Sequence, residues 1–284
     1  MKQKINLSKT LKNKTILVTG GSGSICSVLI KRLLKFPIHS IRVLDINEHS
    51  LFNLKRSLDD KRLRFFLGSI NDLERVDRAC QGADVIIHAA AVKNVDITEF
   101  NPFETIETNI QGTMNMIKSA MKHNPEKFIN ISTDKAVNPS TLYGSTKQIG
   151  EKLICWASDH IDLTKFSTIR FGNVIETRGN IFELWMEQAK NNVPLDITDP
   201  KMKRYFFHVD EAVDFILQCI TISKGGEIFV PKMKLFNIME FANKFSKNHK
   251  IIGIRQGEKL SEVLLTDSEK KSSVEKNNMW IIKP

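Results

Sequence analysis

The sequence predicts an α/β fold, a Rossmann-type doubly wound parallel sheet joined to a smaller C-terminal lobe. Two patterns predict it. Short apolar runs rich in β-branched residues alternate with amphipathic helical stretches along residues 15–174, as in parallel sheets built from strand–helix–strand units. The first of these runs, residues 15–19, leads into a glycine-rich turn and a helical pattern, which is the setting of a dinucleotide-binding loop.

The composition is that of an ordinary globular protein. The chain has 284 residues, of which 41% are hydrophobic and 26% are charged, so it can form one large core and a smaller one. No apolar run approaches the roughly 20 residues that span a membrane. The four cysteines form no CxxC pair. We therefore expect a cytoplasmic protein with reduced thiols, no metal site and no membrane contact.

The net charge of +10 needs an explanation, because strongly basic proteins often bind nucleic acids. Half of this excess lies in a basic N-terminal arm, at Lys2, Lys4, Lys9, Lys12 and Lys14. We expect this arm to be solvated rather than functional. Because no basic stripe with interleaved aromatic residues follows, no nucleic-acid partner is predicted.

The turn after residues 15–19 has the spacing of a pyrophosphate-binding loop. Gly20 and Gly23 allow a tight turn and a close approach of the backbone to the phosphates, and the following helix, with apolar positions up to residue 34, directs its N-terminus at them. Cys26 stands where a third glycine is usual, and a small side chain there costs some packing without abolishing binding. The loop residues expected to contact the cofactor are Gly20, Ser22, Gly23, Ser24 and Ile25.

The second strand, residues 40–44, ends at Asp45. A carboxylate here suits the ribose 2′-hydroxyl of NAD and repels the 2′-phosphate of NADP. The alternative is that Asp45 caps a helix over residues 47–58, and both interpretations stay open. Residues 64–67 are predicted to form the third strand.

The fourth strand, residues 84–88, leads into three alanines. Small side chains at Ala89, Ala90 and Ala91 let a cofactor lie against the strand end. Residues 102–123 are then predicted to form one long helix with an apolar face. Asn109 is the odd residue on it, either a surface amide or a buried one that holds a kink or orients the site.

The fifth strand, residues 127–132, and a helix over residues 142–158 carry the predicted chemistry. Tyr143 and Lys147 are spaced i and i+4, so both lie on one face of the helix. We expect the lysine ammonium to favour ionisation of the phenol, which can then take a proton from a sugar hydroxyl while a nicotinamide takes the hydride. Thr133 could hold the same hydroxyl from the other side.

Asp134 and Lys135 follow the strand directly. Alcohol oxidation does not need them, but an adjacent acid and base would allow a second reaction, in which one proton is removed and a leaving hydroxyl is protonated. The alternative is that Asp134 caps the loop and Lys135 is solvated.

After a sixth strand at residues 167–171 the pattern becomes shorter and less regular. Elements are expected at residues 180–191, 203–209, 211–222, 227–230 and 238–245. We place the boundary between a dinucleotide-binding domain (1–174) and a substrate-binding lobe (175–284) there, with residues 204–222 packing back on the first domain. Basic residues in this part are either surface charges or, where they converge, a diphosphate site: Arg178, Lys203, Arg204, Arg255 and Lys259.

Together these residues resemble the extended short-chain dehydrogenase/reductase superfamily, and within it the short UDP-N-acetylglucosamine 4,6-dehydratases. The resemblance covers residues 15–284. Its motifs are HAAAVK at 88–93, STDKAVNP at 132–139, LYGSTK at 142–147, RFGNV at 170–174, RG at 178–179 and GIRQGEK at 253–259.

The resemblance implies a role for each matching residue. The catalytic residues would be Thr133, Asp134, Lys135, Tyr143 and Lys147. Besides the glycine loop, Asp45 and the alanines, the cofactor would contact Ser69, where relatives usually carry an aspartate, and Ile70, Lys93, Asn109, Tyr143 and Lys147. The UDP-sugar would contact Lys93, Asn173, Arg178, Arg204, Arg255 and Glu258, the last at the uridine ribose.

The resemblance also implies the cofactor, the substrate and the assembly. The cofactor would be NAD(P), tightly bound and recycled in each turnover; Asp45 favours NAD, whereas the habit of the family favours NADP. The substrate would be UDP-N-acetylglucosamine or a related UDP-HexNAc, and the protein a homodimer or higher homo-oligomer that associates through residues 102–123 and 142–158. The alternatives are a UDP-sugar 4-epimerase, which needs no acid–base pair, and a cofactor-binding protein without catalysis.

Overall fold

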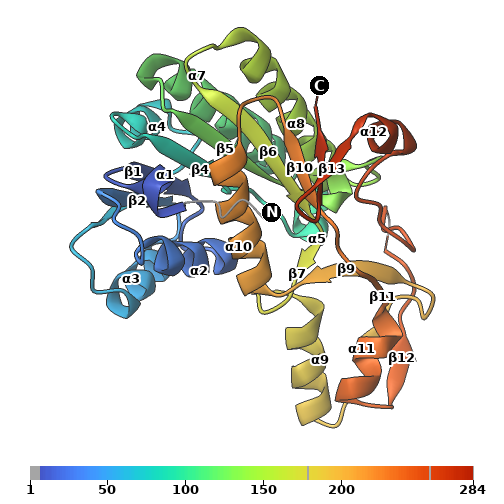
Figure 1. Ribbon diagram of the computed structural model, residues 1–284. Helices are drawn as coiled ribbons and strands as arrows, with labels where there is room; N and C mark the ends of the chain where they lie inside the picture. Colours follow the sequence, from blue (N-terminus) through green and yellow to red (C-terminus); the bar gives the residue numbers. More distant parts are fainter. Residues whose placement is uncertain (1–6, 178, 256, 284) are drawn as a thin grey trace.

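The fold is dominated by one large, mostly parallel sheet (Figure 1). The computed structural model describes residues 7–177, 179–255 and 257–283, and within them the strand order is β13-β14-β10-β6-β5-β4-β1-β2-β3. The strands are β1 (Thr15–Thr19), β2 (Ser40–Asp45), β3 (Leu63–Leu67), β4 (Val85–His88), β5 (Lys127–Thr133), β6 (Lys165–Phe171), β10 (Ile228–Pro231), β13 (Val274–Lys276) and β14 (Met279–Ile282). Only the pairs β10–β14 and β13–β14 are antiparallel among these strands. The predicted doubly wound parallel sheet is confirmed.

Helices cover both faces of the sheet. Alternate residues of β1 enter two different cores: Ile16 and Val18 lie in the core that includes residues of α2 (Ser24–Leu33) and α10 (Val209–Ile222). Leu17 lies in the core that includes residues of α4 (Leu73–Cys80), α7 (Gly112–His123) and α8 (Leu142–His160). Burial on both faces explains why the strand is apolar throughout.

The N-terminal arm is not simply solvated. Within the described residues it begins with the short helix α1 (Leu7–Leu11), whose Leu11 is fully buried in the main core. Lys14 forms ion pairs with Asp84 and Glu126. The expectation of a solvated arm is therefore wrong for this part of it, because an apolar side chain and two carboxylates hold it on the fold; the first six residues lie outside the described chain.

The predicted long helix is interrupted. Residues 102–123 form α6 (Pro102–Ile106), a π-helical turn η1 (Glu107–Gln111) and α7. The helices before it along the chain include α3 (Glu48–Ser57) and α5 (Val95–Phe100). A π-turn is commonly found at functional sites, and here it centres on Asn109, whose contacts are described below.

The C-terminal part has a small core of its own. The core is built from α9 (Ile181–Lys190), β8 (Leu195–Ile197), β9 (Lys203–Phe207) and α11 (Ile238–Phe245), with Phe182, Trp185 and Phe206 at its centre. Figure 1 shows α9, α11 and β12 (His249–Ile251) projecting from the main body. The remaining elements are β7 (Asn173–Val174), β11 (Leu235–Asn237) and α12 (Asp267–Ser272).

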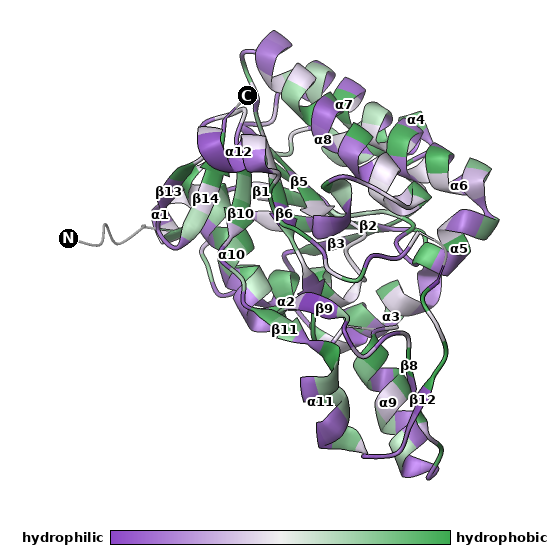
Figure 2. Ribbon diagram, turned by 90° about the vertical axis from the view of Figure 1, so that its right-hand side faces the viewer, coloured by the Kyte–Doolittle hydropathy of each residue, from purple (hydrophilic) through white to green (hydrophobic). Residues whose placement is uncertain are grey.

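Later segments nevertheless return to the large sheet, since β10, β13 and β14 extend it beyond β6 and α10 packs on α2. The division after residue 174 stays a prediction. Figure 2 shows hydrophobic residues concentrated along the central strands. In the part of the chain that the structure describes, no helix combines the length and apolar character needed to cross a membrane.

Candidate active site

The strand order brings the predicted site residues together at the carboxyl ends of the parallel strands. Strands β1, β2, β4 and β5 run parallel, so their carboxyl ends meet at one edge of the sheet. The order reverses between β1 and β4, and ligands of open α/β sheets bind in the crevice beside such a switch point. Gly20, Asp45, Ala89 and Thr133 stand at or just beyond these four strand ends.

The glycine loop has the shape of a pyrophosphate cradle. Gly20 has φ +63°, and a Cβ on it would lie 2.9 Å from the Ala90 backbone, so the position requires glycine. Gly23 is the N-cap of α2 and has no side chain with which to cap it, which leaves the first N–H groups of this helix to an anion. These residues therefore fit a dinucleotide cofactor.

Cys26 lies two residues inside α2. It is buried in the main core, and burial, aided by the negative charge of Asp45, raises the pKa of its thiol to about 12. The side chain thus acts as a small hydrophobic group between helix and sheet.

Asp45 ties the end of β2 to the glycine loop. Its Oδ2 accepts hydrogen bonds from Ser22 N at 3.0 Å and Ser22 Oγ at 2.7 Å, and its Oδ1 accepts one from Asn47 N at 3.0 Å. Asn47, not Asp45, caps α3, because its side chain accepts from Ser50 N. The capping alternative for Asp45 is therefore wrong.

His88, the last residue of β4, directly precedes the three alanines and is a neutral side chain with a structural role. Its Nδ1 is 2.8 Å from Thr19 Oγ1 and its Nε2 is 3.0 Å from Thr113 Oγ1. Thr113 donates its own proton to Asn109 O, so Nε2 must carry the hydrogen. Burial, and secondarily the charge of Lys147, lowers the His88 pKa to about 3. The imidazole therefore fixes the strand ends and takes no part in proton transfer near neutral pH.

Asn109 is the buried amide of the two alternatives. Its Oδ1 accepts from Val92 N at 2.8 Å, and its Nδ2 donates to Val92 O at 2.9 Å and to Thr146 Oγ1 at 3.0 Å. It thereby clamps the loop after β4 to the helix that carries Tyr143. Two further predicted cofactor residues, Ser69 and Ile70, follow β3, and Ile70 packs against Gly112 beside the same π-turn. Lys93 is exposed on the loop itself.

Close packing brings Tyr143 to the acid–base pair. Asp134 and Lys135 begin a 3₁₀ turn (Asp134–Ala136) directly after β5, and α8 packs on this turn. A Cβ on Gly144 would lie 2.3 Å from Lys135 O, so only glycine allows the helix to approach this closely. Thr141 caps α8 by accepting from Gly144 N.

The pair itself is hydrogen-bonded. Thr133 Oγ1 and Lys135 Nζ both donate to Asp134 Oδ1, at 3.0 and 3.1 Å. Asp134 is 0% exposed, and its Oδ2 has no hydrogen-bond partner among the described residues. A Cβ on Gly172 would lie 3.3 Å from this oxygen, so the oxygen faces the backbone of Gly172. The alternative of a solvated Lys135 is wrong, since the ammonium is held beside a buried carboxyl.

The expected ionisation of Tyr143 differs in the structure. Burial raises the pKa of its phenol, the nearby Asp134 raises it further, and a hydrogen bond with Thr133 only partly opposes the increase. Burial lowers the pKa of Lys147 to about 8, with Glu151 opposing the change. The pKa of the phenol is therefore shifted opposite to the expected direction, because desolvation, the largest cause, disfavours the phenolate.

The predicted nucleotide residues are only partly brought together. Arg204 is buried and its Nη2 lies 3.2 Å from Glu258 Oε1, whereas Arg255 is exposed and pairs with Asp96 at 3.4 Å. The Oδ1 of Asn173 is buried without a hydrogen-bond partner among the described residues. Arg178 lies outside the described residues.

A cavity of about 50 Å³ lies between Lys135 and the predicted nucleotide residues Arg255 and Glu258. It is lined by Val95, Lys135, Ser140, Thr141, Arg255, Gly257, Glu258, Lys259 and Glu262. No sequence pattern indicated Glu262, because it lies in an irregular segment without periodicity. In the described chain no cluster of side chains suits a metal ion, and the expected lack of a metal site stays a prediction.

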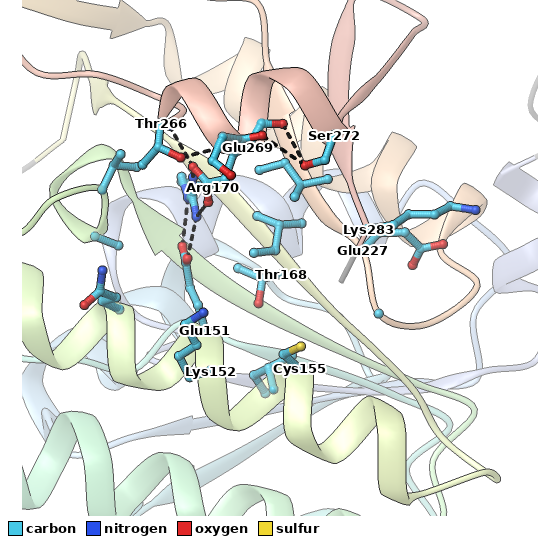
Figure 3. A pocket seen from close by; sticks show the side chains of 18 of the residues that line it. Glu151, Lys152, Cys155, Thr168, Arg170, Glu227, Thr266, Glu269, Ser272 and Lys283 are labelled. Carbon is cyan, nitrogen blue, oxygen red and sulfur yellow. Dashed lines mark hydrogen bonds and ion pairs between the residues drawn. The ribbon is translucent and has the colours of Figure 1, made fainter.

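A larger cavity, of about 410 Å³, lies between α8, β6 and α12 (Figure 3). Its described lining includes neither Tyr143 nor Lys147. Arg170 donates to Glu151 at 2.6 and 3.0 Å and to Glu269 at 2.9 and 3.1 Å, as the dashed lines show. Glu151 also accepts from Ser132 Oγ at 2.6 Å. These hydrogen bonds therefore link the end of β5, through Glu151 and Arg170, to Glu269 in the C-terminal part.

Comparisons with known proteins identify a family that covers nearly the whole chain. The model of a family described as polysaccharide biosynthesis protein matches residues 16–284. A protein of Methanocaldococcus jannaschii named an uncharacterized membrane protein is 44% identical, over 98% of this chain and 88% of that one. A UDP-N-acetylglucosamine 4,6-dehydratase (inverting) of Campylobacter jejuni is 37% identical, over 95% of this chain and 83% of its own.

Other relatives extend this comparison. A Rickettsia bellii protein named UDP-glucose 4-epimerase is 35% identical over the same shares of the two chains, 95% and 83%. Among solved structures, Pen from Bacillus thuringiensis superposes with a TM-score of 0.93 at 32% identity, covering 96% of this chain and 89% of that one.

Proposed function

This chain belongs to the polysaccharide biosynthesis protein family, and on that premise we propose that it is a UDP-N-acetylglucosamine 4,6-dehydratase. The product would be a UDP-4-keto-6-deoxy-HexNAc for glycan or nonulosonic-acid biosynthesis. The single observation that carries the proposal is the pairing of the buried Asp134 with the half-buried Lys135, with Nζ and Oδ1 3.1 Å apart, directly after the strand that ends in Thr133. Oxidation of an alcohol has no use for such a pair, whereas loss of water needs both a base and an acid.

The proposed cofactor is a tightly held nicotinamide dinucleotide. The glycine loop would hold its pyrophosphate, and Asp45 its adenosine ribose. Asp45 supports NAD over NADP. The two arginines that could otherwise hold a 2′-phosphate are hydrogen-bonded to backbone carbonyls: Arg42 Nη1 donates to Ala79 O at 2.8 Å, and Arg64 Nη1 donates to Leu63 O at 2.9 Å. When bound, the nicotinamide supplies the hydride acceptor for C4 and the hydride donor for C6.

The chain's own residues would move the protons. Tyr143, once ionised against the effect of its burial, takes the proton of the C4 hydroxyl while Thr133 hydrogen-bonds that hydroxyl. The resulting ketone acidifies the C5 proton, and Lys135 removes it as the neutral amine. Asp134, as the neutral acid, protonates the departing C6 hydroxyl, so that the C6–O bond breaks and water leaves.

After water has left, each catalytic side chain has to return to its starting protonation state. Once C6 has gained its hydride, Lys135 returns a proton to C5, and the proton held by Tyr143 has to reach Asp134. Thr133 offers the route, because it hydrogen-bonds Tyr143 and donates to Asp134 Oδ1 at 3.0 Å. Because Asp134 is fully buried, proton transfer to the substrate requires a local movement that brings its carboxyl to the C6 hydroxyl.

The second candidate is a UDP-sugar 4-epimerase, supported by the name of the Rickettsia bellii relative. Incubation with UDP-N-acetylglucosamine followed by mass spectrometry separates the two. We expect a product lighter by one water. A product of unchanged mass but altered C4 configuration would favour the epimerase, and no product from any UDP-sugar would favour a binding protein without catalysis.

We also propose that the protein forms a homodimer or higher homo-oligomer. The segment before the π-turn exposes two large aromatic side chains, Phe100 at 87% and Phe103 at 82%, and exposed apolar clusters of this kind commonly mark interfaces. Light scattering on the purified protein would test this, and a monomer at micromolar concentration would contradict it.

A further inference from the structure

We propose that Glu262 is a positioning residue for Lys135, and thereby makes removal of the C5 proton depend on the segment that would bind the nucleotide. This inference rests on the proposed dehydratase function. Its basis is a row in which carboxyl and amino groups alternate, in the order Asp134, Lys135, Glu262, Lys259. Lys135 Nζ lies 3.1 Å from Asp134 Oδ1 and 3.7 Å from Glu262 Oε1, and Lys259 Nζ lies 3.6 Å from Glu262 Oε2.

Glu262 is unusual in being buried without full hydrogen bonding. Its residue exposure is 4%, and its Oε2 has no hydrogen-bond partner among the described residues. A buried carboxylate is costly unless it is paired. Lys259 supplies the compensating charge, Lys135 adds to it whenever it is protonated, and Glu262 in turn restricts where the Lys135 side chain can lie.

The two carboxylates beside Lys135 have different tasks. Asp134 is covalently adjacent and gives its proton to the leaving hydroxyl. Glu262 comes from the C-terminal part and does not have to give up a proton. When Lys135 takes the C5 proton and becomes an ammonium, Glu262 is the carboxylate that offsets the new charge. When Lys135 returns that proton to C5, Glu262 keeps the side chain aimed at the same carbon.

The segment that carries Glu262 also packs against the loop that follows Asp134 and Lys135. A Cβ on Gly257 would lie 2.5 Å from Ser140 O, and Lys259 Nζ donates to Val137 O at 2.9 Å. Glu258, the proposed uridine-ribose contact, lies between these two residues. Nucleotide bound at Glu258 would therefore act directly on the position of Glu262, and through it on Lys135.

The test compares two steps of one reaction in Glu262→Gln, which keeps the shape but removes the charge. With UDP-N-acetylglucosamine in deuterated water, single-turnover nicotinamide absorbance reports oxidation at C4, and mass spectrometry reports deuterium at C5. We expect C5 exchange to slow on the order of 10²-fold while C4 oxidation stays within about threefold of wild type. Reduced nicotinamide should accumulate.

Two further variants sharpen the test. Glu262→Asp keeps the charge on a shorter side chain, so C5 exchange should slow selectively but only about tenfold; this variant also serves if Glu262→Gln does not fold. The control is Glu275→Gln, which removes a mostly exposed carboxylate that pairs with Lys232. It should leave both steps unchanged.

Three results would overturn the inference: wild-type exchange in Glu262→Gln, equal slowing of both steps, or a Glu262→Asp variant no better than Glu262→Gln. Each of these leaves the proposed function standing if the wild-type protein releases water. If wild-type protein neither exchanges C5 nor releases water, the proposed function has failed, and the inference fails with it.

Discussion

Replacing Asp134 by asparagine separates loss of water from oxidation. The asparagine side chain introduced by Asp134→Asn keeps an oxygen that can accept the hydrogen bonds now donated by Thr133 Oγ1 at 3.0 Å and Lys135 Nζ at 3.1 Å. It cannot supply the proton that the C6 hydroxyl needs. Loss of a general acid slows its step typically by about 10²- to 10⁴-fold, equivalent to about 3 to 5 kcal/mol of activation free energy.

The structure also gives a cost in stability. The amide nitrogen of the asparagine would replace Oδ2, which is buried and has no hydrogen-bond partner among the described residues. An unsatisfied buried donor costs about 1–3 kcal/mol, although removal of a buried charge offsets part of it. Urea unfolding would measure this change separately, so that a fall in rate is not mistaken for a fall in folded protein.

The assay follows nicotinamide absorbance and product mass after addition of UDP-N-acetylglucosamine. Asp134→Asn should accumulate reduced cofactor and release water slowly. Lys135→Ala should stop solvent deuterium from entering C5, and Tyr143→Phe should show neither signal because the first hydride transfer is blocked. If Asp134→Asn and Lys135→Ala both turn over normally, the two residues are structural and the epimerase becomes the favoured function.

Three other predictions follow from charged side chains of the structure. Arg170→Ala leaves Glu151 buried and uncompensated, so the free energy of unfolding in urea should fall by about 3–5 kcal/mol; a loss below about 1 kcal/mol would contradict this. Asp45→Ala removes the carboxylate that holds Ser22, and calorimetry should show NAD binding weakened at least about tenfold; wild-type protein that prefers NADP would refute the role given to Asp45. The pKa of Lys147 is lowered from 10.5 to about 8 in the folded protein. Between these pH values the unfolded chain therefore binds more protons than the folded chain, and the contribution of Lys147 to the free energy of unfolding rises with pH. Lys147→Met should therefore stabilise the protein by roughly 3 kcal/mol near pH 7 and by little near pH 10.5, and an equal effect at both would contradict the shift.

Local patterns in the sequence were enough for the features that depend on neighbouring residues. The glycine turn between strand and helix, and the i, i+4 spacing of Tyr143 and Lys147, are set by backbone geometry over a few residues. The parallel order of the first strands follows as well, because strand–helix–strand connections cross over with one hand. The alternation of elements therefore predicted the fold class, and the motifs predicted which residues stand at the strand ends.

Several properties of individual residues were decided only by the tertiary structure. Whether Asn109 is a surface or a buried amide depends on Val92 and Thr146, which approach it from other elements. The pKa of Tyr143 follows from how completely the fold removes water from it, which no spacing reports.

Contacts between distant segments were decided by the fold alone. The approach of Glu262 to Lys135, and of Glu269 to Arg170, depends on the path of the chain through the C-terminal part and back to the large sheet. Nothing in the residues beside a carboxylate specifies which distant cation it will meet, because that partner is selected by the packing of the whole core. Which residues gather at the strand ends was therefore predictable from the sequence, whereas the groups that contact them from distant segments became visible only in three dimensions.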